Sequence, residues 1–319
     1  MLKLRSTFSR NPRIYPLMEG VVQAAGIEID VDTVDHGDTF AWLLDHGSES
    51  DLFEFSISHY MTTFERNEAR WDWTAIPIFL AKATPFLETR VHNNAGVTSP
   101  ADLRGKRVGM GDFAMTAGVW LRVALNDIYG VRPQEVTWFA GRARHRSHDM
   151  QLGIEETLRS DLSVTWLDED GALDRLLRAG ELDAAFGVKD DPLIHPLFPG
   201  GGSGLFAEFQ RTCGYVPVNH ILLVRRPIVE ENPWVPEALY EAFEASKRAA
   251  YQRDPSTALV LPGQDADAQR DLYGSDPYPS GVAANRAMLA AVAQQSYAEG
   301  LTRGLLDVEQ LFWESVRDT

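Results

Sequence analysis

The sequence predicts an α/β protein of two units with mainly parallel sheets. The chain has 319 residues, which is more than one hydrophobic core usually organises. Short apolar segments typical of strands alternate along it with segments of helical character, as in proteins with parallel sheets. One stretch, residues 103–129, combines a strand, a turn with glycines and a helix. The start of such a helix presents N–H groups and partial positive charge, so it is suited to binding a carboxylate or a phosphate.

The first unit is expected to be rich in strands. Residues 2–6 alternate leucine with basic or polar residues, as a strand with one buried face does. Residues 16–25 predict a helix that ends at Gly26. In the strand expected at 52–57, Glu54 lies between two phenylalanines. It is either the polar position of an edge strand or a buried carboxylate that needs a partner. The other expected elements are strands at 27–34, 75–79 and 89–92 and helices at 40–46 and from residue 58.

The second unit is expected to start near residue 93, after which the chain returns to the first. The expected strands are 107–110, 136–139, 182–188 and 220–224, and the expected helices are 173–179, 236–252, 285–299 and 308–316. This order is typical of the type II periplasmic-binding-protein-like fold. We predict a discontinuous lobe I of residues 1–92 plus 217–319, with lobe II, residues 93–216, inserted. A two-segment hinge is expected near 91–94 and 215–219, with a ligand held between the lobes.

Composition excludes several classes of function. The formal net charge of −16 argues against nucleic acid and anionic membranes as partners, whereas a small carboxylate substrate is compatible with it. The one cysteine, Cys213, excludes an intrachain disulfide and a cysteine-rich metal site. No apolar stretch reaches the roughly 18 residues that a membrane span needs. The first residues also lack the apolar core of a signal peptide, so we expect a cytoplasmic location. A homo-oligomer is compatible with the sequence.

Several motifs follow one another in a recognisable order. They are Ala-Ile-Pro-Ile-Phe at 75–79, Ser-Pro-Ala-Asp-Leu-Arg-Gly-Lys-Arg-Val-Gly at 99–109, Met-Thr-Ala at 115–117, Asn-Pro-Trp-Val at 232–235 and Asn-Arg at 285–286. In this order they resemble the 4,5-dihydroxyphthalate decarboxylase family, and the resemblance spans nearly the whole chain. It implies a periplasmic-binding-protein-like fold and a cofactor-independent decarboxylase of a hydroxylated aromatic, phthalate-like or related carboxylic acid. Residues 81–86 differ from the family, in which arginines follow the first motif and Lys82 stands here.

Decarboxylation of such an acid requires a proton donor near the ring carbon and an acceptor for the phenol. His220 is the first candidate for the donor, because it lies at the expected return between lobes and histidine titrates near neutrality. His59, after the strand at 52–57, is the second. Structural alternatives are a histidine that starts a strand for His220 and a surface residue of a first helical turn for His59. Asp112 is expected to accept the phenol proton or to cap its helix.

Cations and helix starts are the groups expected to hold the substrate carboxylates. The candidates are Arg10, Arg13, Ser58, Lys82, Met115, Thr116 and Arg211. Ser58 has the alternative of capping the helix that follows. The basic run at 142–149 is expected to be a solvated or lid-like loop. His145 and His148 within it lack a third ligand, so no metal is expected.

Two other functions stay open at this point. One is a non-catalytic solute-binding protein of the same fold, which the lack of a signal peptide and of a lipobox cysteine disfavours. The other is another lyase on this scaffold, such as a menaquinone-pathway enzyme, which the Asn-Pro-Trp-Val and Asn-Arg motifs disfavour.

Overall fold

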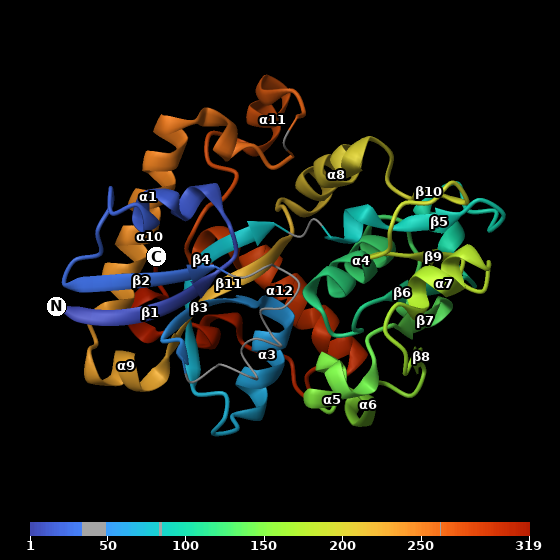
Figure 1. The fold of residues 1–319 in the computed structure, drawn as a ribbon, viewed down its shortest axis with the longest axis horizontal. Coiled ribbons are helices and arrows are strands. Elements are labelled where there is room, and N and C mark those ends of the chain that lie inside the picture. The colour runs from blue at the N-terminus through green and yellow to red at the C-terminus, as the bar shows by residue number, and fades with distance from the viewer. Residues whose placement is uncertain (34–48, 83–84, 262) are drawn as a thin grey trace. The chain divides into compact units, whose positions relative to one another are not determined.

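The computed structural model describes residues 1–33, 49–82, 85–261 and 263–319 (Figure 1). The helix expected at 40–46 lies outside these ranges. The chain divides into two compact units, and each has its own sheet. The first unit comprises Met1–Lys82, Val218–Leu289 and Asp307–Thr319, and the second comprises Ala83–Pro217 and Ala290–Leu306. The predicted α/β class is confirmed.

All five strands of the first sheet have one terminus at the same edge. Its order is β2 (Ile27–Thr33), β1 (Leu2–Phe8), β3 (Leu52–Ser56), β11 (Val218–Arg225) and β4 (Trp73–Lys82). Strands β1, β2 and β3 are parallel, whereas β11 runs antiparallel to both of its neighbours. Strands β1, β3 and β4 therefore end at the edge where β11 begins. We call this the carboxyl edge of the first sheet.

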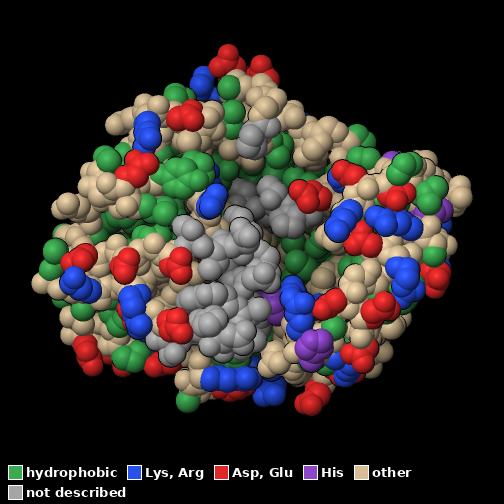
Figure 2. Space-filling view, viewed as in Figure 1, with side chains coloured by type: hydrophobic (Ala, Val, Ile, Leu, Met, Phe, Trp, Pro, Cys, Tyr) green, Lys and Arg blue, Asp and Glu red, His purple; other side chains and the backbone are tan. Residues whose placement is uncertain are grey.

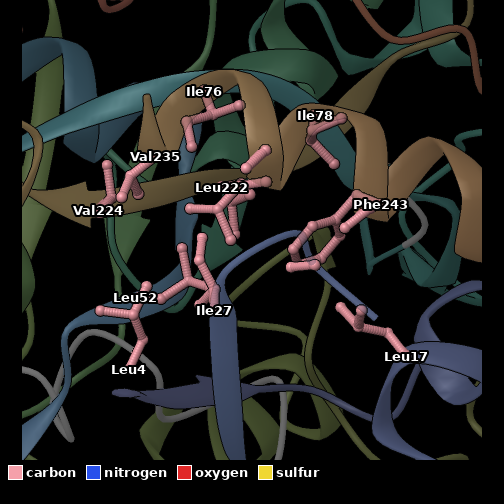
Figure 3. Packing of buried hydrophobic residues seen from close by; sticks show 14 of the residues in the cluster. Leu4, Leu17, Ile27, Leu52, Ile76, Ile78, Leu222, Val224, Val235 and Phe243 are labelled. Atoms are coloured by element: carbon pink, nitrogen blue, oxygen red, sulfur yellow. The ribbon is translucent and has the colours of Figure 1, made fainter. Parts of the chain in front are cut away.

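Helix α10 (Val235–Arg253) supplies the apolar side chains that cover one face of this sheet. Phe243 of α10 and Leu222 of β11 belong to the same buried cluster (Figure 3). The unit's other helices are α1 (Tyr15–Met18), α3 (Ile57–Arg66), α9 (Arg226–Glu231), α11 (Ala266–Tyr273) and α12 (Val282–Glu299), the last of which continues into the second unit. The helix expected at 16–25 is shorter than predicted, because Gly20 adopts a φ of 72° two residues after α1 ends.

The second sheet combines parallel and antiparallel strands. Its order is β10 (Ile194–Pro196), β5 (Arg90–His92), β9 (Ala184–Ala185), β6 (Arg107–Met110), β7 (Thr137–Ala140) and β8 (Ser163–Trp166). Strands β9, β6, β7 and β8 are parallel, and β5 is antiparallel to β9 and β10. The division between units therefore falls at residue 82 and not at the expected 92, because β5 pairs in the second sheet. Residues 290–306 also belong to the second unit.

The second unit's helices are α4 (Thr116–Asp127), α5 (His148–Gln151), α6 (Ile154–Thr157), α7 (Ala172–Arg178) and α8 (Ser203–Cys213). Helix α7 packs closely on the sheet because Gly109 has no side chain. A β-carbon at Gly109 would lie 2.6 Å from Leu173 Cδ2. Short 3-10 turns cover Pro12–Ile14, Pro85–Glu88, Pro100–Leu103, Pro133–Glu135, Arg144–Arg146, Pro199–Gly202, Pro255–Ala258, Val308–Leu311 and Glu314–Val316.

Charged side chains of both signs intermingle over the face shown in Figure 2. The acidic excess of the chain is therefore not gathered into one block on that face. Among the described helices, none is both long and apolar enough to cross a membrane.

Candidate active site

Glu54 is a buried carboxylate, and the edge-strand interpretation is wrong. Strand β3 lies inside the first sheet, between β1 and β11, so Glu54 is only 1% exposed. The register pairs His220 of β11 with Ser56, which lies two residues beyond Glu54 on the same face of β3. Diagonal neighbours on one face are close enough for long side chains to meet. The buried carboxylate is thereby brought to the histidine.

The Glu54 carboxylate joins His220 to the loop after β1. His220 Nδ1 lies 2.6 Å from Glu54 Oε1, and the backbone N–H of Ser9 donates to Oε2 over 3.0 Å. The hydroxyl of Ser9 also donates to Oε2. A carboxylate at Nδ1 fixes the orientation of the ring and favours a proton on that nitrogen. Ser9 was not among the residues predicted for the site, although its position directly after a strand at this edge was a usable signal.

An irregularity in β4 anchors the same loop. Between the pairs His220–Ala81 and Ile221–Phe79, Leu80 is an extra residue on β4. The carbonyl of Leu80 accepts hydrogen bonds from Asn11 Nδ2 at 2.6 Å and from Arg13 Nη2 at 3.0 Å. Bulges of this kind are common beside active sites. Here the hydrogen bonds to the Leu80 carbonyl hold in place the loop that contains the candidate Arg10.

The two candidate arginines of this loop have different surroundings. The guanidinium of Arg13 stacks on the ring of Tyr278, 3.6 Å from its centroid, and also donates to the carbonyl of Thr257. Arg10 is exposed. With the described part of the chain it forms no hydrogen bond or ion pair. Arg10 is therefore the better placed of the two to bind a carboxylate from solution.

Three further candidates lie at or beside the carboxyl edge of the first sheet. Lys82 is the last residue of β4. His59 and Ser58 lie in the first turn of α3 and are buried, so the surface alternative for His59 is wrong. Ser56 and not Ser58 occupies the N-cap position of α3, so the capping alternative for Ser58 is also wrong. The edge thus gathers most of the candidates predicted for the first unit.

In the second unit, Asp112 organises the turn after β6. Asp112 is fully buried, and its carboxylate accepts from Arg142 Nε at 2.6 Å, Ser147 Oγ at 2.7 Å and the backbone N–H of His148 at 2.9 Å. These contacts bury the end of the basic run, so the expectation of a solvated loop is wrong for residues 147–149. Residues 144–146 of the run are exposed, as expected.

Asp149 completes this network from the other side of the turn. It accepts from the backbone N–H groups of Phe113 and Ala114, at 2.6 and 2.9 Å, and from Trp166 Nε1 at 3.0 Å. Burial, and after it the neighbouring Asp112 carboxylate, raise the pKa of Asp149 to about 7. Burial, with Arg142 and Arg146, lowers the pKa of His148 well below its ordinary value.

Asp149→Asn is expected to change the pH dependence of stability. The folded-state pKa of Asp149, about 7, lies above the unfolded value, so its stabilising contribution is present at acid pH and lost as the pH rises through 7. The loss of unfolding free energy caused by Asp149→Asn should be larger at pH 5 than at pH 8. Denaturant titrations followed by tryptophan fluorescence measure this difference. A difference independent of pH would contradict the assignment.

The remaining candidates lie on two helices of the second unit. Met115 is the N-cap of α4 and Thr116 is its buried first residue. Arg211, in the last turn of α8, pairs with Glu208 at 2.9 Å and is exposed. Within the described ranges, no group of three or more His, Cys, Asp or Glu side chains is arranged to hold a metal ion.

Two characterised proteins are similar to this chain in sequence. A 4,5-dihydroxyphthalate decarboxylase from Comamonas testosteroni is 29% identical over 324 residues, covering 98% of this chain and 96% of that protein. A 4,5-dihydroxyphthalate decarboxylase from Pseudomonas putida is 30% identical over 177 residues, covering 56% of this chain and 67% of that protein. No protein-family model matches the chain.

Solved structures support the fold. The periplasmic aliphatic sulphonate binding protein SsuA from Escherichia coli matches with a TM-score of 0.54 at 16% identity, covering 99% of both chains. The Candida albicans CA3427 gene product, described as having the generic periplasmic binding protein fold, matches with a TM-score of 0.54 at 11% identity. It covers 97% of this chain and 93% of its own. The predicted periplasmic-binding-protein-like fold is confirmed.

Proposed function

Because this chain belongs to the 4,5-dihydroxyphthalate decarboxylase family, we propose that it is a carboxy-lyase that removes a carboxylate from a hydroxylated aromatic acid as carbon dioxide. The observation that carries the chemical part of the proposal is the contact between His220 and Glu54 at the carboxyl edge of the first sheet. It provides a titratable proton donor whose orientation is set by a buried carboxylate.

The proposed reaction transfers one proton and breaks one carbon–carbon bond. The His220 imidazolium gives the proton on Nε2 to the ring carbon that bears the carboxylate, and the phenolic oxygen supplies electron density to the ring. The bond to the carboxylate then breaks, its electron pair restores the aromatic ring, and carbon dioxide leaves. The neutral imidazole recovers a proton from water. Glu54 stabilises the imidazolium and keeps the ring in place, and these steps call for no cofactor.

Arg10 is proposed to bind a substrate carboxylate. It follows Ser9 directly, in the loop held by Glu54 and by the Leu80 carbonyl. A hydrogen bond between charged groups contributes about 1.5–3 kcal/mol, so Arg10→Ala should raise KM roughly tenfold to a hundredfold. Lys3→Ala, which removes an exposed cation of β1 paired with Glu28, is the matched control and should leave KM unchanged. Equal KM values for Arg10→Ala and the parent would remove Arg10 from the site.

For the other candidates, a role in the site stays a prediction. They are Asp112, Arg13, His59, Ser58, Lys82, Met115, Thr116 and Arg211. For Asp112, the contacts favour a role in orienting Arg142.

The proposed activity is tested by incubating the purified protein with 4,5-dihydroxyphthalate and a set of hydroxylated benzoates while carbon dioxide is measured. We expect release from at least one hydroxylated acid and none from unsubstituted phthalate, which lacks the electron-donating hydroxyl. Binding of these acids without any release would favour the solute-binding alternative and contradict the decarboxylase.

A further inference from the structure

Asn219 lies in a β-bulge next to the proposed acid. In the pairing of β11 with β4, Val218 is opposite Lys82 and His220 is opposite Ala81, so Asn219 is an extra residue without a cross-strand partner. A bulge bends its strand and changes the direction of a side chain, and bulges are over-represented next to active sites. Asn219 precedes His220 directly and belongs to the same unit.

The side-chain carbonyl of Asn219 is an unsatisfied acceptor. Its Oδ1 is buried and accepts no hydrogen bond from the described residues. Leaving a buried acceptor unsatisfied costs about 1–3 kcal/mol, so native structures rarely retain one without a reason. The bulge and the unsatisfied oxygen are independent observations. The bulge makes the strand irregular directly beside His220, and the unsatisfied oxygen is an acceptor to which a hydrogen-bond donor from outside the protein can bind.

We propose that Asn219 Oδ1 accepts a hydrogen bond from a phenolic hydroxyl of the substrate and selects hydroxylated acids. This inference rests on the proposed function and assigns one of its specificity contacts. When the ring carbon is protonated, the hydroxyl oxygen donates electron density and its O–H becomes a stronger donor. The amide oxygen therefore stabilises the transition state more than the bound substrate. The hydroxyl keeps its proton throughout, because a neutral amide is too weak a base to remove it.

The test compares a ligand whose ring oxygens can donate a hydrogen bond with a methylated ligand whose ring oxygens cannot. The dissociation constants of 3,4-dihydroxybenzoate and 3,4-dimethoxybenzoate are measured by calorimetry for the parent protein and for Asn219→Ala. Asn219→Ala should weaken binding of the dihydroxy acid about tenfold and leave the dimethoxy acid unchanged. Asn126→Ala, which alters an exposed asparagine of the second unit, should change neither constant.

Equal weakening of both acids by Asn219→Ala would show a structural role and overturn the inference, as would no change in either. A parent protein that binds neither acid would also overturn it. Failure of the proposed function gives a different result. The parent protein would then bind the dihydroxy acid in preference to the dimethoxy acid but release no carbon dioxide from any substrate. That result would contradict only the decarboxylase.

Discussion

His220→Gln is expected to lower kcat by a factor of roughly 10² to 10⁴, which is the range that a positioned general acid contributes. Glutamine retains a donor for Glu54 and a similar volume, but it cannot deliver a proton near neutral pH. His220 is 4% exposed and contacts Glu54 over 2.6 Å, so the substitution acts on a buried, oriented group. Steady-state rates with the best substrate measure the effect.

The matched control is His195→Gln. His195 lies in β10 of the second unit and is half-buried, with Nδ1 3.0 Å from Asn93 Oδ1. His195→Gln should leave kcat within a factor of two, and circular dichroism should show that both variants fold. Activity of His220→Gln near that of the control would exclude His220 as the proton donor.

Glu299→Gln is expected to destabilise the second unit by about 3–5 kcal/mol, because it leaves a buried guanidinium without its counter-ion. Arg122 of α4 is fully buried, and its Nε and Nη2 lie 2.5 and 2.8 Å from the carboxylate oxygens of Glu299 in α12. Arg122 Nη2 also donates to the carbonyl of Phe113, at the start of the turn into α4. Denaturant titration of the variant measures the loss.

The exposed pair Arg144–Glu155 of the same unit provides the comparison. Its atoms lie 2.6 Å apart with both side chains more than 40% exposed, so Glu155→Gln should cost at most about 1 kcal/mol. The double variant Arg122→Met/Glu299→Leu should be less destabilised than Glu299→Gln, because no unpaired charge remains. A loss below 1 kcal/mol for Glu299→Gln would contradict the assigned role of the pair.

Local patterns identified the candidate residues of the first unit but not how they are paired. His220 and Glu54 were each identified from their own strand, yet they lie 166 positions apart. Their contact depends on β11 entering the sheet antiparallel between β3 and β4. The alternation of buried and exposed residues along one strand does not reveal which strands lie beside it in the sheet. The same limit explains why an edge strand remained an alternative for Glu54.

The second unit shows a related limit. The run at 142–149 is rich in charge, which favours exposure, and three of its residues are exposed. Ser147 and Asp149 are buried because their partners Asp112, Phe113 and Ala114 lie some 35 residues away, in the turn after β6. The density of charge along a segment does not predict that one of its carboxylates is buried and hydrogen-bonded to backbone N–H groups far away in the sequence.

The proposed proton transfer to the ring carbon is tested most directly by the decarboxylation of 4,5-dihydroxyphthalate in deuterium oxide, with deuterium in the product located by nuclear magnetic resonance. We expect one equivalent of carbon dioxide and one deuterium at the ring carbon that lost the carboxylate, because the proton from His220 exchanges with solvent between turnovers. Release of carbon dioxide with no deuterium at that carbon, or no release at all, would contradict it.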